Sequence, residues 1–97
     1  MSDWRLIVEA RVSPEVEDQW NHWYDEEHLP QVASCPGFVS ATRMVSRGRG
    51  PRLYLSEYVI DDPSTLTTPE FSAARGWYQF EERLEARTRL FEIVTRR

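Results

Sequence analysis

Residues 4–20 read WRLIVEARVSPEVEDQW, and this stretch decides the fold. Its first part, Trp4–Val12, alternates hydrophobic and polar side chains with the two-residue period of a strand that has one buried face. Ser13, Pro14 and Glu15 then supply a helix N-cap, a proline at the first helical position and an acid in the first turn. The stretch therefore predicts a strand that leads directly into a helix.

The predicted first helix is amphipathic. Large apolar side chains such as Val16 and Trp20 recur at three- and four-residue spacing, while acidic residues occupy the opposite side. Pro30 interrupts a regular helix and disfavours helical geometry at Leu29, so the helix is expected to end near His28. A helix C-terminus favours the protonated form of a histidine.

The remainder of the chain predicts three more strands and a second helix. Residues 38–46 and 52–60 form two strand-like runs around a Gly- and Pro-containing turn. A helical region is expected over residues 61–84, with an interruption at Pro69, and residues 88–95 alternate again. The order predicts an α+β fold of the ferredoxin-like βαββαβ type with a four-stranded antiparallel sheet.

One domain over residues 1–97 accounts for this length. Two helices cover only one face of such a sheet, so the bare face needs a partner. Two copies packed face to face close into a dimeric α/β barrel, and we expect a homodimer whose enclosed gap holds a ligand.

The strand parity predicts which side chains face that gap. Leu6, Val8 and Ala10, together with Phe91 and Ile93, are suited to packing beneath the helices. The opposite parity places Glu9, Glu57 and Glu92 among apolar residues, where they line a polar pocket or form ion pairs between subunits. In the second strand, either Arg43 with Val39 and Ala41, or the set Phe38, Ser40, Thr42 and Met44, shares that face.

Composition excludes several classes of partner. The net charge is −4 and the pI about 5.1, so nucleic acid is not expected. No apolar run has the length of a membrane span or a signal peptide, and Cys35 is the single cysteine, so the cytoplasm is expected. The sequence also lacks a metal-ligand set at credible spacing and a Gly-rich phosphate loop, so no cofactor is expected.

Residues 20–30, WNHWYDEEHLP, are followed by Pro36-Gly37-Phe38, then Ala41 and Arg43. This pattern resembles the W-Y-x-x-E-H-x-P, P-G-F and A-x-R signature of EthD-like members of the dimeric α/β-barrel superfamily. The resemblance implies the dimeric barrel and places a histidine at the barrel mouth. It leaves the reaction open, because this superfold hosts monooxygenases, isomerases, cyclases, dehydratases and proteins without assigned activity.

The candidate catalytic residues are His28, Tyr24 and Arg43. An imidazole titrates near neutrality and serves as acid or base, while a tyrosine hydroxyl and a guanidinium stabilise a developing oxyanion. Glu27 is expected to orient the imidazole or to pair with Arg43, and Trp23 to line the pocket. Glu9 or Glu57 is expected to orient the catalytic groups. Non-catalytic alternatives are a carbonyl cap ahead of Pro30 for His28 and simple core packing for Tyr24.

These residues predict a cofactor-independent small-molecule enzyme that performs proton-transfer chemistry, of the isomerase, cyclase, dehydratase or lyase type, on a hydrophobic aromatic or polyketide-like substrate. One alternative is a cofactor-free monooxygenase. Another is a non-catalytic ligand-binding or dimerisation domain, which predicts a small or fully ion-paired pocket and a His28 hydrogen-bonded to backbone.

Overall fold

The four strands form one antiparallel sheet in the order β2-β3-β1-β4. The computed structural model describes residues 3–97; Met1 and Ser2 of the expected 1–97 domain lie outside the described residues. The strands are β1 (Trp4–Val12), β2 (Phe38–Val45), β3 (Tyr54–Ile60) and β4 (Leu84–Glu92). This confirms the predicted α+β ferredoxin-like fold.

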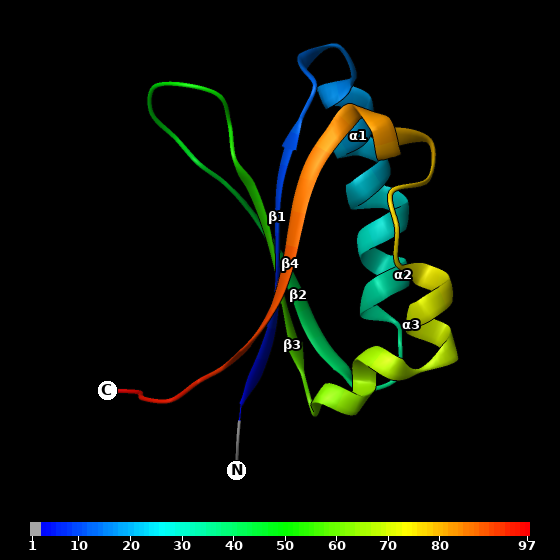
Figure 1. Ribbon diagram of the computed structural model, residues 1–97, viewed down its shortest axis with the longest axis vertical. Coiled ribbons are helices and arrows are strands. Elements are labelled where there is room, and N and C mark those ends of the chain that lie inside the picture. The colour runs from blue at the N-terminus through cyan, green and yellow to red at the C-terminus, as the bar shows by residue number, and fades with distance from the viewer. Residues whose placement is uncertain (1–2) are drawn as a thin grey trace.

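All the helical segments lie on one side of the sheet, and the other side is bare (Figure 1). The first connection contains the 3-10 turn η1 (Pro14–Val16), α1 (Glu17–Trp23), the π-helical turn η2 (Tyr24–His28) and α2 (Leu29–Ala33). The second contains the 3-10 segment η3 (Pro63–Thr67), α3 (Pro69–Ala74) and the 3-10 segment η4 (Tyr78–Arg83). In residues 3–97 no helix has the length and apolar character needed to cross a membrane.

The expectation that the first helix ends near His28 is wrong. The Leu29 backbone N–H donates to the Tyr24 carbonyl five residues earlier, so the helix widens into a π turn rather than stopping. Pro30 then lies in the first turn of α2, where a missing N–H costs little. The helix continues to Ala33, and His28 is therefore an interior helical residue.

The second helix is shorter than predicted. The Thr68 hydroxyl accepts the Phe71 N–H at 3.1 Å and caps α3, which ends at Ala74. Arg75 is extended, and Gly76 has a φ of 117°, so the backbone leaves helical geometry at this point. The strand β4 starts at Leu84 rather than at residue 88.

The β-sheet register corrects the predicted parity of β4. Leu6 lies opposite Leu90, and Arg5 lies opposite Phe91. Because cross-strand partners share a face, Phe91 belongs to the bare face, where it is 49% exposed, and Glu92 takes the helix-facing parity. Ile93 lies beyond the end of β4, so the expectation that Phe91 and Ile93 pack beneath the helices is wrong.

A bulge in β2 decides the face of Arg43. The register shifts between Phe38 and Ser40, after which Ala41 lies opposite Tyr58 and Arg43 opposite Ser56. Arg43 and Ala41 therefore face the helices, whereas Thr42 and Met44 share the bare face with Glu57 and Leu55.

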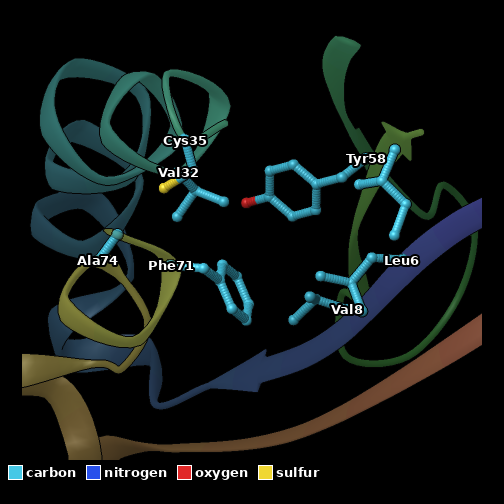
Figure 2. Packing of buried hydrophobic residues seen from close by; sticks show 8 residues of the cluster. Leu6, Val8, Val32, Cys35, Tyr58, Phe71 and Ala74 are labelled. Atoms are coloured by element: carbon cyan, nitrogen blue, oxygen red, sulfur yellow. The ribbon is translucent and has the colours of Figure 1, made fainter. Parts of the chain in front are cut away.

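Two adjoining clusters fill the space between sheet and helices. The first contains Leu6, Val8, Val32, Cys35, Tyr58, Ile60, Phe71 and Ala74. In Figure 2 the ring of Tyr58 reaches from β3 toward Val32, while Phe71 approaches from α3. The second contains Ala10, Trp20, Trp23, Tyr24 and Phe80. Where the two clusters meet, aromatic side chains surround His28.

Candidate functional site

A pocket of about 520 Å³ lies between the helix-facing side of the sheet and the helical layer. This volume is in the range that takes a small organic ligand. Apolar residues such as Leu6, Val8, Val32 and Phe71 form one part of its wall, and polar or charged residues such as Tyr58 and Thr88 form the other part. The pocket lies within one protomer, and the sheet separates it from the bare face. It is therefore a different place from the expected gap between two sheets, which stays a prediction.

His28 lines this pocket and is 5% exposed. Its ring stacks on Trp23 with centroids 4.7 Å apart, meets the ring of Tyr24 at 5.0 Å and lies 5.5 Å from Trp77. The Nδ1 atom is enclosed and has no hydrogen-bond partner among the described residues. The imidazole is therefore held in place by aromatic packing, and its Nδ1 atom is not used in a hydrogen bond.

Burial of His28, with a smaller contribution from the positive charge of Arg43, lowers its pKa to about 4. The imidazole is consequently neutral at pH 7. This reverses the expectation of a protonated histidine at a helix end, because His28 lies inside the continuous helix and among aromatic rings. A neutral imidazole can accept a proton, as a general base must.

Three hydroxyl groups meet beside the pocket, those of Tyr24, Ser56 and Tyr58. The Ser56 Oγ donates to the Tyr24 hydroxyl at 2.8 Å, and the Tyr24 and Tyr58 hydroxyl oxygens are 3.2 Å apart. Three hydroxyl protons thus serve two hydrogen bonds, so one tyrosine proton has no acceptor in this cluster. Burial raises the pKa of both tyrosines, which keeps them protonated and able to donate. Both rings line the pocket.

Arg43 supports Tyr24 from outside the pocket lining. Its guanidinium lies 4.3 Å from the Tyr24 ring centroid and donates to Asp25 Oδ1 at 2.6 Å and to Asn21 Oδ1 at 2.8 Å. Arg43 was expected to contact a substrate oxyanion directly, but it does not line this pocket. Arg43 instead fixes Tyr24 and contributes a positive charge that acts on His28.

Glu27 and Trp23 lie behind the imidazole. Glu27 is exposed in a separate groove that also contains His22 and Arg83, and Asp25 takes the ion pair with Arg43 that was expected of Glu27. Trp23 lines this second groove and also stacks on His28. Trp23 therefore orients the imidazole, and Glu27 does not reach it within the helical layer.

Glu9 and Glu57 are not part of this pocket. Glu57 lies opposite Ile7, and Glu9 opposite Leu55 and Arg87, all of the bare-face parity. The expectation that either carboxylate orients Tyr24 or Arg43 is wrong within the protomer, because the sheet backbone lies between them.

Ser56 and Tyr58 are not among the residues predicted for the site, although Tyr58 lines the pocket and Ser56 donates to Tyr24. A signal for both was available: Tyr54, Ser56, Tyr58 and Ile60 share one parity of β3, so a small polar residue interrupts an otherwise large set. Trp77 also lines the pocket, and it follows a break at Gly76 that the helical region expected over residues 61–84 does not include.

A family model described as Domain of unknown function (DUF4286) matches residues 6–89. No curated protein matches the chain.

Among solved structures, a mutant form of SnoaB, a cofactor-independent oxygenase from Streptomyces nogalater, is 16% identical with a TM-score of 0.75, over 97% of this chain and 95% of that one. An ethyl tert-butyl ether d (ethd) family protein from Bacillus halodurans is 17% identical with a TM-score of 0.67, over 88% and 95%. A dimeric ferredoxin-like protein from an uncultured marine organism is 11% identical with a TM-score of 0.68, over 99% of each chain. At these identities the likeness is one of fold.

Proposed function

Because the chain belongs to DUF4286, a family of domains of unknown function, we propose its activity from its own pocket: a cofactor-independent enzyme that removes a proton from a hydrophobic carbonyl compound. The single observation that carries this proposal is a neutral, buried His28 that lines a pocket of ligand size beside a tyrosine hydroxyl with a spare proton.

The imidazole supplies the base. A low pKa limits the driving force for proton abstraction, so the substrate carbon must be activated by an adjacent carbonyl and flanking unsaturation. The apolar part of the wall favours a ligand with a flat or extended hydrocarbon body.

The hydroxyl cluster supplies the oxyanion stabilisation. Removal of a proton beside a carbonyl moves negative charge onto the carbonyl oxygen, and a fixed donor is most effective where that charge develops. Tyr24 and Tyr58 share one free proton, and Ser56 holds the pair in place. The two groups together favour enolisation, after which reprotonation, ring closure or elimination gives the isomerase, cyclase, dehydratase or lyase outcome.

A cofactor-free monooxygenase is the second candidate, because the fold is shared with a cofactor-independent oxygenase. The carbanion formed at a CH2 group would then add dioxygen to give a hydroperoxide. Loss of water from the hydroperoxide would leave a carbonyl group in place of the CH2 group, so the substrate itself supplies the electrons. Consumption of dioxygen during turnover separates this outcome from simple proton transfer.

The geometry argues against a purely non-catalytic domain. That alternative expected a small or ion-paired pocket and a His28 bonded to backbone. His28 instead lines a pocket of about 520 Å³, and its Nδ1 atom has no partner among residues 3–97.

We also propose that the chain forms a single domain and works as a cytoplasmic homodimer, as an EthD-like protein. The support for the dimer is the bare sheet face, where Met44 is 45% and Phe91 49% exposed next to charged side chains of both signs. The support for the EthD-like relationship is the signature over residues 20–43.

The test uses exchange of the carbon-bound protons of 2-tetralone in deuterium oxide, followed by proton NMR. The chain should accelerate exchange, and His28→Phe, which keeps the aromatic stack, should abolish the acceleration. The matched control is His22→Phe, since His22 is an exposed residue of the same helix. Equal acceleration by wild type and His28→Phe would eliminate His28 as the base. An oxygen electrode run on the same samples tests the second candidate.

A further inference from the structure

The mouth of the pocket carries charge, whereas its interior does not. Arg75 and Glu81 are the two residues with charged side chains among the pocket-lining part of residues 3–97, and both are exposed. They lie in the second connection, Arg75 directly after α3 and Glu81 in η4. Ala86 and Thr88 of the edge strand β4 are also exposed although they have the helix-facing parity, so the pocket opens on this side.

Arg75 lies next to the pocket wall and forms no ion pair within residues 3–97. Its backbone N–H donates to the Phe71 carbonyl at 2.9 Å, and its guanidinium carbon lies 5.9 Å from the centroid of the Phe71 ring. Phe71 is itself a wall of the pocket. Within the described residues no carboxylate lies within ion-pairing distance of Arg75, unlike Arg43, Arg52, Arg83 and Arg96. A guanidinium held at a pocket mouth with free donors is suited to a planar anion.

Glu81 limits the charge of that anion. Its carboxylate borders the same pocket and also lacks an ion pair among residues 3–97. Each added negative charge on a ligand is repelled by Glu81, so the mouth favours one negative charge over two. A carboxylate meets this condition better than a doubly charged phosphate ester.

We propose that the pocket takes a hydrophobic monocarboxylate, with its carboxylate on Arg75 at the mouth and its apolar body between β1, α2 and α3. This assignment rests on the proposed function, because it concerns the ligand of the same pocket. It specifies the substrate class further: the reacting carbonyl lies at the hydroxyl cluster, and the carboxylate marks the opposite end of the molecule.

The test compares 2-naphthoate with 2-naphthamide, a neutral analogue of the same shape, by isothermal titration calorimetry. Wild type should bind naphthoate about two- to fivefold more tightly than naphthamide, the strength of a solvent-exposed ion pair. Arg75→Gln should remove this preference without weakening naphthamide, and Glu81→Gln should increase it. Arg47→Gln is the matched control, because Arg47 is an exposed arginine of the β2–β3 loop, remote from the pocket lining.

The outcomes separate this inference from the proposed function. Equal binding of both probes by wild type, or an equal effect of Arg47→Gln and Arg75→Gln, would overturn the monocarboxylate assignment and leave the pocket enzyme standing. Failure of both probes to bind at millimolar concentration would overturn the assignment together with the ligand pocket. Absence of accelerated proton exchange in wild type, together with a preference for naphthoate over naphthamide, would overturn the proposed reaction alone.

Discussion

Because His28 is buried in its neutral form, the free energy of unfolding should fall in acid. The substitution His28→Phe should remove this part of the pH dependence. Folding lowers the pKa of His28 from the ordinary value of 6.5 to about 4. Between these values the unfolded chain binds a proton that the native state does not, so the free energy of unfolding falls as the pH drops below about 6.5. The full loss is reached near pH 4 and amounts to about 3 kcal/mol.

The assay is urea denaturation of wild type and His28→Phe at a series of pH values between 4 and 7.5. Wild type should lose about 3 kcal/mol more than the variant across this range, and carboxylates such as Glu17, whose pKa is lowered by hydrogen bonds from Arg52 and Tyr54, contribute equally to both proteins and cancel. His22→Phe should follow the wild-type curve. Parallel curves for wild type and His28→Phe would refute the claim that the imidazole is buried in its neutral form.

Four further measurements test the structure and the proposed mechanism. Arg43→Gln should raise the pKa of His28 above about 4, although burial should keep it below the ordinary value. NMR titration of the imidazole protons measures this pKa, and an unchanged value would contradict the electrostatic role of Arg43. Tyr24→Phe should lower the rate of exchange about a hundredfold or more, with Tyr54→Phe, outside the hydroxyl cluster, as control; equal rates would remove the hydroxyl cluster from the reaction. Gly37→Ala should destabilise the fold by about 2 kcal/mol or more, because a Cβ at this positive-φ position would lie 2.3 Å from Thr65 Oγ1. Gly48→Ala is the control: Gly48 also has a positive φ, but a Cβ there would meet nothing within 4 Å. The control should therefore lose less stability in the same urea assay. Phe91→Glu should convert a dimer into a monomer by light scattering while Leu90→Glu, exposed on the opposite face of β4, should not; a dimer in both would place the interface elsewhere.

The local patterns of the sequence predict the sheet better than they predict the helices. Alternation over Trp4–Val12, interrupted at Ile7, predicts β1, and the Pro36-Gly37 turn predicts the start of β2. The parity of β4 fails because Leu90 and Phe91 are both large and apolar, so the pattern alone gives no preference between the two phases. Only the pairing with β1 decides that Leu90 faces the helices and Phe91 the bare side.

The candidate site is predicted in part for a related reason. His28 and Tyr24 lie one helical turn apart, so their common face follows from the sequence. The face of Arg43 does not, because it depends on the bulge in β2. Ser56 and Tyr58 come from a strand distant in sequence, and only the β3 register brings their hydroxyls to Tyr24.

The π turn links the local sequence to the properties of His28. A proline two residues after the histidine would normally end the helix and leave the imidazole at its C-terminus, near solvent and the negative end of the dipole. The wider turn over Tyr24–His28, closed by the Leu29 N–H and the Tyr24 carbonyl, lets the chain pass Pro30 and continue to Ala33. The extra helical turn carries Val32 over the sheet, and this coverage, together with Trp23 and Trp77, buries the imidazole. Pro30 would normally predict a helix end at His28. Because the π turn lets the helix continue past Pro30, His28 is buried instead, and this burial lowers the pKa of the proposed base.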